Sequence, residues 1–200
     1  MVEDSLLVSD IAIRAMRFDD LERVTAVDEM SFSMPWPPHA YYKEMEKSYS
    51  LTRVAEITFM SGSQHVAGMM VTWVVMDEAH IATLAVDPEY RRLGIARRLL
   101  ADTLKLCIQQ SVHVVTLEVR VSNQAAQVLY RSFKFEEVAR RKGYYMDNHE
   151  DALIMNVYDL NEAYLAWITD HILKMNHGWI HKVDSYRGDA QDTKEEKCGF

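Results

Sequence analysis

The sequence predicts an α+β fold, an α/β three-layer sandwich whose central sheet is mixed but mostly antiparallel and is flanked by helices. Two observations predict it. In the first half of the chain, a strand-like segment and two helix-like segments precede three strand-like segments separated by short turns. In the second half, helix-like and strand-like segments alternate before two last strand-like segments. This mixed order is typical of a sheet that has helices packed on it.

The first half contains six predicted elements, which rest on hydrophobic periodicity and turn chemistry. Asp19 and Asp20 precede a helix whose apolar residues recur every three positions up to Met30, so we expect them to cap it. The proline-rich loop 33–38 stops that helix, and residues 61–64 make a hairpin connection. The predicted ranges are a strand at 11–16, helices at 21–30 and 39–47, and strands at 51–59, 66–75 and 80–86.

The second half begins with a loop that opens a long amphipathic helix ending near Gln110. A shorter helix carrying Tyr130 lies between the later strands, which we predict at 114–121, 138–141 and 151–158. After Asp159 the pattern changes to a helix that Asn161 can cap and that ends near 176–178. The apolar residues on one side of this helix are Tyr164, Trp167, Ile168, Ile172 and Met175.

These patterns divide the chain into three parts. We expect one domain at 10–158, a helical extension at 159–183 and a polar tail at 184–200 that is mobile. The extension could cover part of the sheet, pack on a second subunit or lie near a substrate groove. A monomer or a weak homodimer is the expected state.

The composition is that of an ordinary globular protein, with 48% hydrophobic and 26% charged residues among 200. The two cysteines, Cys107 and Cys198, are too few for a disulfide framework, so we expect free thiols in a reducing compartment. The sequence has neither a signal-peptide pattern nor an apolar run of membrane-spanning length, and these absences favour a cytoplasmic protein that contacts no membrane. The formal charge of −8 argues against a nucleic-acid binder and is compatible with a cationic partner such as an amine.

The loop from Arg91 to Ala96 is the first candidate binding site. It presents successive backbone N–H groups at a helix N-terminus, where partial positive charge collects and anions bind. Gly94 allows the backbone to approach an anion closely. A plain strand-to-helix connection with solvated arginines explains the same residues equally well. The glycine loop of nucleotide kinases is excluded, because its lysine is absent.

Three further polar residues are ambiguous when each is taken alone. Glu118 shares one face of its strand with Thr116 and Arg120, and a solvent-facing carboxylate is the more common explanation for such a residue. Tyr130 could belong to the core or its rim as readily as to an active site. Asn123 is most simply a helix N-cap.

The order and spacing of these residues nevertheless resemble those of the GNAT acetyltransferases. The resemblance covers about residues 10–158. Within this superfamily the chain is most similar to the RimI-type protein N-terminal acetyltransferases, which include the ribosomal-protein alanine acetyltransferase. The motifs that carry the resemblance are Leu84–Ala96 with its Arg-x-x-Gly-x-Ala turn, Leu117–Asn123, Ala125–Tyr130, Tyr144-Tyr145 and Glu150–Ala152.

The resemblance implies an acetyl-CoA site and direct acetyl transfer to the N-terminal amine of a protein or peptide, with a ribosomal protein or a nascent chain as candidate partners. Glu118 matches the family's general base and Tyr130 its general acid. The residues expected to hold acetyl-CoA are Leu84, Ala85, Val86, Arg91, Arg92, Leu93, Gly94, Ile95, Ala96, Arg97 and Asn123. The residues expected to hold the peptide are Phe32, Pro35, Trp36, Tyr144 and Tyr145.

Two features depart from the family pattern or invite another function. Lys134 stands where the family usually has a glycine after the Tyr130 helix, so the helix end is expected to differ locally. His171, His177 and His181 suggest a metal site, but no carboxylate or cysteine completes the set, and we expect none.

Two alternative functions remain open at this point. The first keeps the chemistry but uses a small amine, such as a polyamine or an aminoglycoside, as the acceptor. The second is a non-catalytic CoA-binding module. The aromatic residues Trp36, Tyr144 and Tyr145 favour a peptide slot over a polyamine site, and the presence of both Glu118 and Tyr130 weighs against a binding module.

Overall fold

The computed structural model describes residues 8–172, and its elements alternate in the predicted order. The strands are β1 (Val8–Ala15), β2 (Ser50–Phe59), β3 (Gln64–Val75), β4 (Glu78–Val86), β5 (Val114–Arg120), β6 (Glu136–Tyr145) and β7 (Glu150–Val157). The α-helices are α1 (Leu21–Ser31), α2 (Pro38–Glu46), α3 (Ile95–Gln109) and α4 (Gln124–Ser132), and residues 162–172 are also helical. Two single 3-10 turns, η2 (Phe18–Asp20) and η3 (Pro88–Tyr90), precede α1 and α3.

The seven strands form one sheet in the order β1-β2-β3-β4-β5-β7-β6. All neighbouring pairs are antiparallel except β4 and β5, which run parallel. The parallel ladder is short, because it ends at the pair Ile81–Leu117 while β4 continues to Val86 and β5 to Arg120. The two halves of the sheet therefore separate in the middle of the molecule, at the carboxyl ends of β4 and β5.

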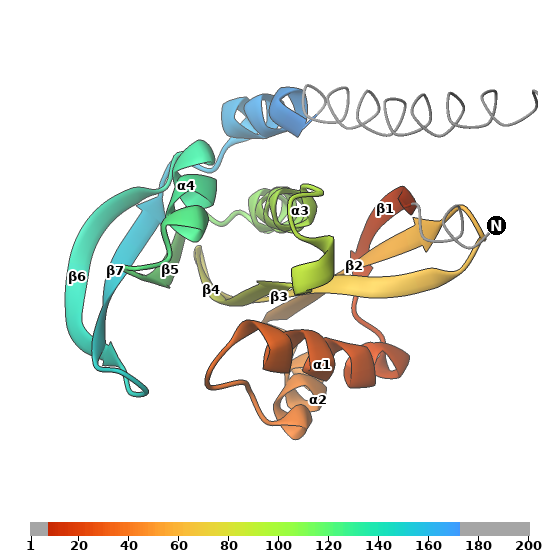
Figure 1. Ribbon diagram of the computed structural model, residues 1–200. Coiled ribbons are helices and arrows are strands. Elements are labelled where there is room, and N and C mark those ends of the chain that lie inside the picture. Colours follow the sequence, from red (N-terminus) through yellow and green to blue (C-terminus); the bar gives the residue numbers. More distant parts are fainter. Residues whose placement is uncertain (1–7, 173–200) are drawn as a thin grey trace, which may run out of the picture.

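Helices cover both faces of this sheet, as Figure 1 shows, with α3 and α4 on one side and α1 and α2 on the other. The larger apolar core lies under α3 and α4 and includes Leu99, Leu104, Leu117 and Phe133. The smaller core lies between the sheet and the pair α1 and α2. Helix α3 approaches β3 closely at Gly68, where a Cβ would stand 2.9 Å from Ile95 Cγ2. The predicted three-layer sandwich is confirmed.

The predicted boundaries hold to within about two residues for most elements, and the exceptions have physical causes. Strand β6 is longer than predicted, since its charged, exposed edge residues hide the alternation that marks a strand. Met30 is 46% exposed, because a repeat of three drifts around a helix of 3.6 residues per turn.

Asp20 corrects one prediction about the start of α1. It occupies the N-cap position but makes no side-chain capping hydrogen bond. Its carboxylate instead accepts two hydrogen bonds from the guanidinium of Arg14, at 2.7 and 2.8 Å, and a third from the N–H of Arg17. A bidentate, charge-assisted pair of this kind is stronger than an ordinary cap, so the carboxylate is used there.

The helix at residues 162–172 packs on the end of α4. Asn161 caps it as predicted, since its side-chain oxygen accepts the N–H of Tyr164 at 3.1 Å. The hydroxyl of Tyr164 donates to the carbonyl oxygen of Phe133 at 2.6 Å, and Ile168 is fully buried in the larger core. Met175, the predicted helix end, His177, His181, Cys198 and the polar tail lie outside the described residues.

Candidate active site

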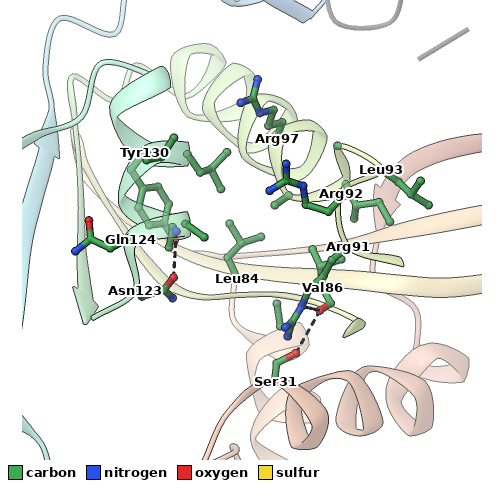
Figure 2. A pocket seen from close by; sticks show the side chains of 18 of the residues that line it. Ser31, Leu84, Val86, Arg91, Arg92, Leu93, Arg97, Asn123, Gln124 and Tyr130 are labelled. Carbon is green, nitrogen blue, oxygen red and sulfur yellow. Dashed lines mark hydrogen bonds between the residues drawn. The ribbon is translucent and has the colours of Figure 1, made fainter. Parts of the chain in front are cut away.

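A cleft of about 1010 Å³ opens where β4 and β5 separate. Its walls come from the end of β4, the loop before α3, the first turn of α3, and α4, with Ser31 and Phe32 at the end of α1 (Figure 2). All eleven residues expected to hold acetyl-CoA line this cleft: Leu84, Ala85, Val86, Arg91, Arg92, Leu93, Gly94, Ile95, Ala96, Arg97 and Asn123. Residues far apart in the sequence thus form one continuous surface.

The loop before α3 has the backbone conformation expected of an anion site. Gly94 lies at the N-cap of α3 with φ of 80°, and Arg92 has φ of 71°. Left-handed residues next to right-handed ones turn successive N–H groups into a concave cradle that binds anions. Figure 2 shows the Arg92 and Arg97 side chains along this wall of the cleft. The loop thus combines backbone donors with arginine side chains at the cleft wall.

The end of β4 is held in place by the residues around it. The carbonyl oxygen of Val86 accepts hydrogen bonds from Arg91 Nε at 3.2 Å and from Ser31 Oγ at 3.4 Å (Figure 2). The next residue, Asp87, is buried, and its carboxylate pairs with Arg23 of α1. Helix α1, β4 and the loop before α3 are therefore connected at one corner of the cleft.

Helix α4 contributes Asn123 and Tyr130 to the opposite wall. The side-chain oxygen of Asn123 accepts the N–H of Ala126 at 3.0 Å, so its simplest predicted role, the N-cap of α4, is confirmed. Tyr130 lines the cleft and is largely buried. Burial raises the pKa of the Tyr130 hydroxyl above its ordinary value, and the group therefore stays protonated at neutral pH.

Glu118 is not among the residues that line the cleft; it is the first residue of β5 beyond the parallel ladder, at the point where β4 and β5 begin to separate. Its Oε2 lies 2.6 Å from Nε2 of His80, and its Oε1 lies 3.5 Å from the guanidinium of Arg141. The hydrogen bond with His80 holds the pKa of the Glu118 carboxyl below its ordinary value. The carboxyl is therefore ionised at neutral pH, as a proton acceptor must be.

The two segments expected to hold a peptide meet in space. Ser33, in the loop after α1, donates a hydrogen bond to Asp147, in the turn between β6 and β7. Arg120 fixes this turn by binding Asp147 at 2.8 Å and Glu150 at 3.1 Å. Its guanidinium also lies 3.8 Å from the centre of the Tyr145 ring. Loop and turn thus bridge the two halves of the separated sheet.

The five expected peptide residues have different environments within this bridge. Phe32 is 40% exposed and lines the cleft, Tyr144 is 37% exposed, and Pro35 is exposed in the loop. Trp36 is half-buried and packs against Trp73 and Tyr41. Tyr145 lies under Arg120, as described above. Phe32, Pro35 and Tyr144 are thus open to a ligand, whereas Trp36 and Tyr145 form part of the scaffold.

His80 is the functional candidate that sequence reasoning missed. It is the third residue of β4, and it has the one titratable side chain between Ala79 and Val86. One signal in the sequence could have found it, namely its polar, titratable side chain within an otherwise apolar strand.

The described residues contain neither a membrane-length helix nor a cluster suited to a metal. Within residues 8–172, no helix has the length and hydrophobicity needed to cross a membrane. In the same part of the chain, no three histidine, cysteine or acidic side chains are grouped as metal ligands would be. His171, the described member of the histidine set, packs instead between aromatic rings. Its ring centre lies 4.9 Å from that of Trp167 and 5.6 Å from that of Phe133.

Comparison with known proteins identifies relatives that match over most of their length. A Bacillus subtilis (strain 168) protein provisionally assigned as the ribosomal protein bS18-alanine N-acetyltransferase is 39% identical over 145 residues, which cover 72% of this chain and 93% of that protein. The ribosomal protein bS18-alanine N-acetyltransferase of Escherichia coli (strain K12) is 32% identical over 145 residues, covering 72% and 94% respectively.

A solved structure and a family profile also match this chain. The crystal structure of the ribosomal-protein-S18-alanine N-acetyltransferase from Escherichia coli superposes with a TM-score of 0.66 at 31% identity, over 75% of this chain and 94% of that one. The sequence profile of the acetyltransferase (GNAT) family matches residues 21–135, from the start of α1 to the end of the turn after α4. The chain therefore belongs to the acetyltransferase (GNAT) family, as its motifs predicted.

Proposed function

We propose that this protein transfers an acetyl group from acetyl-CoA directly to the N-terminal amine of a protein. The observation that carries the proposal is the cleft at the separation of β4 and β5, whose wall holds the arginine-rich loop at the N-terminus of α3, together with Glu118 just beyond the end of the β4–β5 ladder. A site for acetyl-CoA needs the first feature, and a site that activates an amine needs the second.

The cleft suits acetyl-CoA in size and in chemistry. Its volume of about 1010 Å³ lies at the upper end of the range for cofactor sites, as a long, charged cofactor requires. The N-terminus of α3 with Arg91, Arg92 and Arg97 would hold the pyrophosphate. The apolar residues Leu84 and Leu129 line the same cleft and would pack against the pantetheine arm. Acetyl-CoA supplies the acetyl group as a thioester.

Glu118 is the residue that would prepare the amine. A free α-amine has a pKa near 8, so much of it is protonated at neutral pH and must lose a proton before it can attack a thioester carbonyl. Glu118 would accept that proton, directly or through one water molecule. The low pKa of its carboxyl keeps it ready to do so over a wide pH range.

Tyr130 would donate the second proton. When the new C–N bond forms and the C–S bond breaks, the departing sulfur of coenzyme A carries the electron pair and needs a proton. The Tyr130 hydroxyl lines the cleft and stays protonated because it is buried. Backbone N–H groups near Val86 would stabilise the carbonyl oxygen as negative charge develops on it. Direct transfer forms no covalent intermediate on the enzyme. Cys107, the cysteine within the described residues, agrees with this because it is fully buried in the core.

The bridge between the loop after α1 and the β6–β7 turn favours a peptide as the acceptor. Phe32, Pro35 and Tyr144 present exposed apolar surface there, which suits the first residues of a polypeptide better than a polycation. The relatives reported above are named as ribosomal protein bS18-alanine N-acetyltransferases, the Bacillus subtilis one provisionally, and a ribosomal protein or nascent chain is the corresponding substrate class for this chain.

One experiment tests the function. The purified protein is incubated with acetyl-CoA and peptides that differ in their first two residues, with spermidine as a competing acceptor, and the products are identified by mass spectrometry. We expect acetyl groups on peptide α-amines. The variant Glu118→Gln should turn over more slowly but bind acetyl-CoA with unchanged affinity. Acetylation of spermidine alone would overturn the proposal, as would full activity of Glu118→Gln.

A further inference from the structure

Three side chains link helix α2 to Glu118 across the face of the sheet that α1 and α2 cover. Glu44 of α2 accepts a hydrogen bond from the indole N–H of Trp73, at 2.8 Å. The Trp73 ring centre lies 5.4 Å from that of His80, and His80 Nε2 lies 2.6 Å from Glu118 Oε2. The contacts therefore run Glu44, Trp73, His80, Glu118.

The Glu44 carboxylate, at the first position in this series of contacts, is held in place by several hydrogen bonds. It is 5% exposed, and its carboxylate is fully used by Lys47 at 2.7 Å, Ser50 at 2.8 Å and Trp73. These hydrogen bonds hold the pKa of Glu44 below its ordinary value against the opposing effect of burial, so it accepts from the indole as an anion. A charged acceptor makes a hydrogen bond about twice as strong as a neutral one.

The fixed position of the Trp73 ring restricts the orientation of the His80 ring. The two residues are directly opposite one another in the β3–β4 register, so their side chains rise from the same face of the sheet. The Trp73 ring is itself stacked on Trp36, with centres 6.4 Å apart and planes at 17°. An indole tied at its nitrogen and stacked on a second ring has one orientation, and the imidazole packed against it is restricted with it.

We propose that Glu44 and Trp73 are positioning residues, which fix the His80 imidazole in the orientation that binds Glu118. Neither residue is among those that line the cleft, and neither is among the groups whose charge or hydrogen bonds shift the pKa of Glu118. The proposal rests on the proposed function, in which Glu118 is the proton acceptor. It assigns a catalytic consequence to α2, a helix for which the sequence predicted no part in the site.

The consequence concerns the pH dependence of the reaction. The titratable or charged groups that face Glu118 are His80 from β4, and Arg141, Tyr144 and Tyr145 from β6. His80 makes the largest contribution to lowering the pKa of Glu118. If the imidazole loses its orientation, the Glu118 pKa rises toward its ordinary value. As the solution is acidified, activity then begins to fall at a higher pH than it does in the parent protein.

The test compares Trp73→Phe and Glu44→Ala with Ser50→Ala. Trp73→Phe keeps an aromatic ring but removes the N–H donor. Ser50→Ala removes a hydrogen bond of the same 2.8 Å length from the same carboxylate and leaves the indole bond intact, so it is the matched control. The measurement is kcat/KM for a peptide acceptor as a function of pH. We expect the acid limb to move up by about one pH unit in the first two variants, which is a loss of about tenfold at low pH. Ser50→Ala should keep the parent profile.

A second measurement does not depend on activity. The ring nitrogens of His80 are followed by NMR in selectively labelled protein, with His80→Gln used to assign the signal. We expect a hydrogen-bonded Nε2 in the parent and in Ser50→Ala, and an averaged signal in Trp73→Phe. Glu44→Gln keeps an acceptor oxygen and should largely restore the parent behaviour.

The outcomes separate the two proposals. Parent pH profiles in Trp73→Phe and Glu44→Ala, with only a lower melting temperature, would show that these residues are structural and overturn the positioning role. An acid limb that moves equally in Ser50→Ala would attribute the effect to general loosening of α2 and overturn it too. If the parent protein acetylates no peptide amine, the proposed function fails, and the His80 signal alone still decides whether Glu44 and Trp73 fix the imidazole.

Discussion

The imidazole of His80 and the carboxylate of Glu118 meet at 2.6 Å, on two strands that run parallel only up to the neighbouring pair Ile81–Leu117. The pair therefore sits where the sheet begins to separate and the cleft begins. A carboxylate placed there keeps a hydrogen-bond partner, and that hydrogen bond lowers the pKa of the Glu118 carboxyl. The position of the Glu118 carboxylate and its charge state thus both follow from the place where these two strands separate.

Replacing His80 should change the pH dependence of the reaction. The pKa of Glu118 is lowered chiefly by its hydrogen bond with His80, so the deprotonated carboxylate persists to lower pH than usual. His80→Gln should raise that pKa and move the acid limb of kcat/KM to higher pH, with a small effect on the plateau. His113→Gln is the control, because His113 is exposed and lies before the start of β5. An acid limb that stays in place in His80→Gln would contradict this role.

Gly94 offers a direct test of the anion-binding loop. It has φ of 80°, and an added Cβ would meet nothing within 4 Å, so Gly94→Ala should fold with a loss of about 1 kcal/mol. It should also weaken acetyl-CoA binding by about tenfold, since the N–H groups at the start of α3 would shift from the phosphates. Gly62→Ala is matched: Gly62 has φ of 84°, equal free space, and a place in the β2–β3 turn.

Calorimetric titration with acetyl-CoA and thermal denaturation separate the two effects. Both variants should lose similar stability, and only Gly94→Ala should lose affinity. Equal affinities for acetyl-CoA in the two variants would argue that the loop does not hold the cofactor's phosphates.

Tyr130 and Tyr164 form a second matched pair. Both are buried tyrosines that pack near the end of α4. Tyr130→Phe should lower kcat by about a hundredfold or more with little change in stability, because the proton donor is lost while the ring remains. Tyr164→Phe leaves the carbonyl of Phe133 without the donor now at 2.6 Å, so it should cost about 1–3 kcal/mol of unfolding free energy and leave kcat unchanged.

Steady-state kinetics and urea denaturation of the two variants check this prediction. A Tyr130→Phe enzyme with parent kcat would remove Tyr130 from the reaction and leave solvent as the proton source for the leaving thiolate.

The residues that line the cleft could be predicted from the sequence because most of them are contiguous. The loop before α3 and the helix start follow one another along the chain, so local rules for glycine and helix N-termini describe them. The pairs His80–Glu118, Ser33–Asp147 and Glu44–Trp73 join residues 38, 114 and 29 positions apart. Alternation shows which residues share a face of a strand, but it does not show which strand lies beside it.

Trp36 illustrates the same limit on the substrate side. The resemblance to the family implied that this residue of the proline-rich loop holds the peptide. In the structure the backbone N–H of Trp36 donates a hydrogen bond to the buried carboxylate of Asp28, at 2.6 Å. The Trp36 ring stacks on that of Trp73. An aromatic residue in a loop is stabilised more by packing on a nearby apolar surface than by exposure to solvent. No local sequence pattern shows that such a surface lies near the loop. Its predicted contact with the peptide remains to be tested.

Lys134 has an unfavourable backbone conformation and a compensating contact. Its φ is 62°, in the left-handed region that favours glycine, at the end of α4. Its ammonium lies 4.3 Å from the centre of the Trp167 ring, in the helix at residues 162–172. A cation over an indole face contributes about 0.5–1 kcal/mol at an exposed site, similar in size to the backbone cost. The contact ties the helix at 162–172 to the end of the helix that carries Tyr130.

A double-mutant cycle tests this compensation. Lys134→Gly in the parent protein removes the unfavourable conformation and the cation together, so the unfolding free energy should change by less than about 0.5 kcal/mol. In a Trp167→Leu background the contact is already absent, and the same substitution should stabilise the protein by about 1 kcal/mol. Urea denaturation of the four proteins gives the coupling energy. An identical effect of Lys134→Gly in both backgrounds would mean that Trp167 does not offset the strain at Lys134.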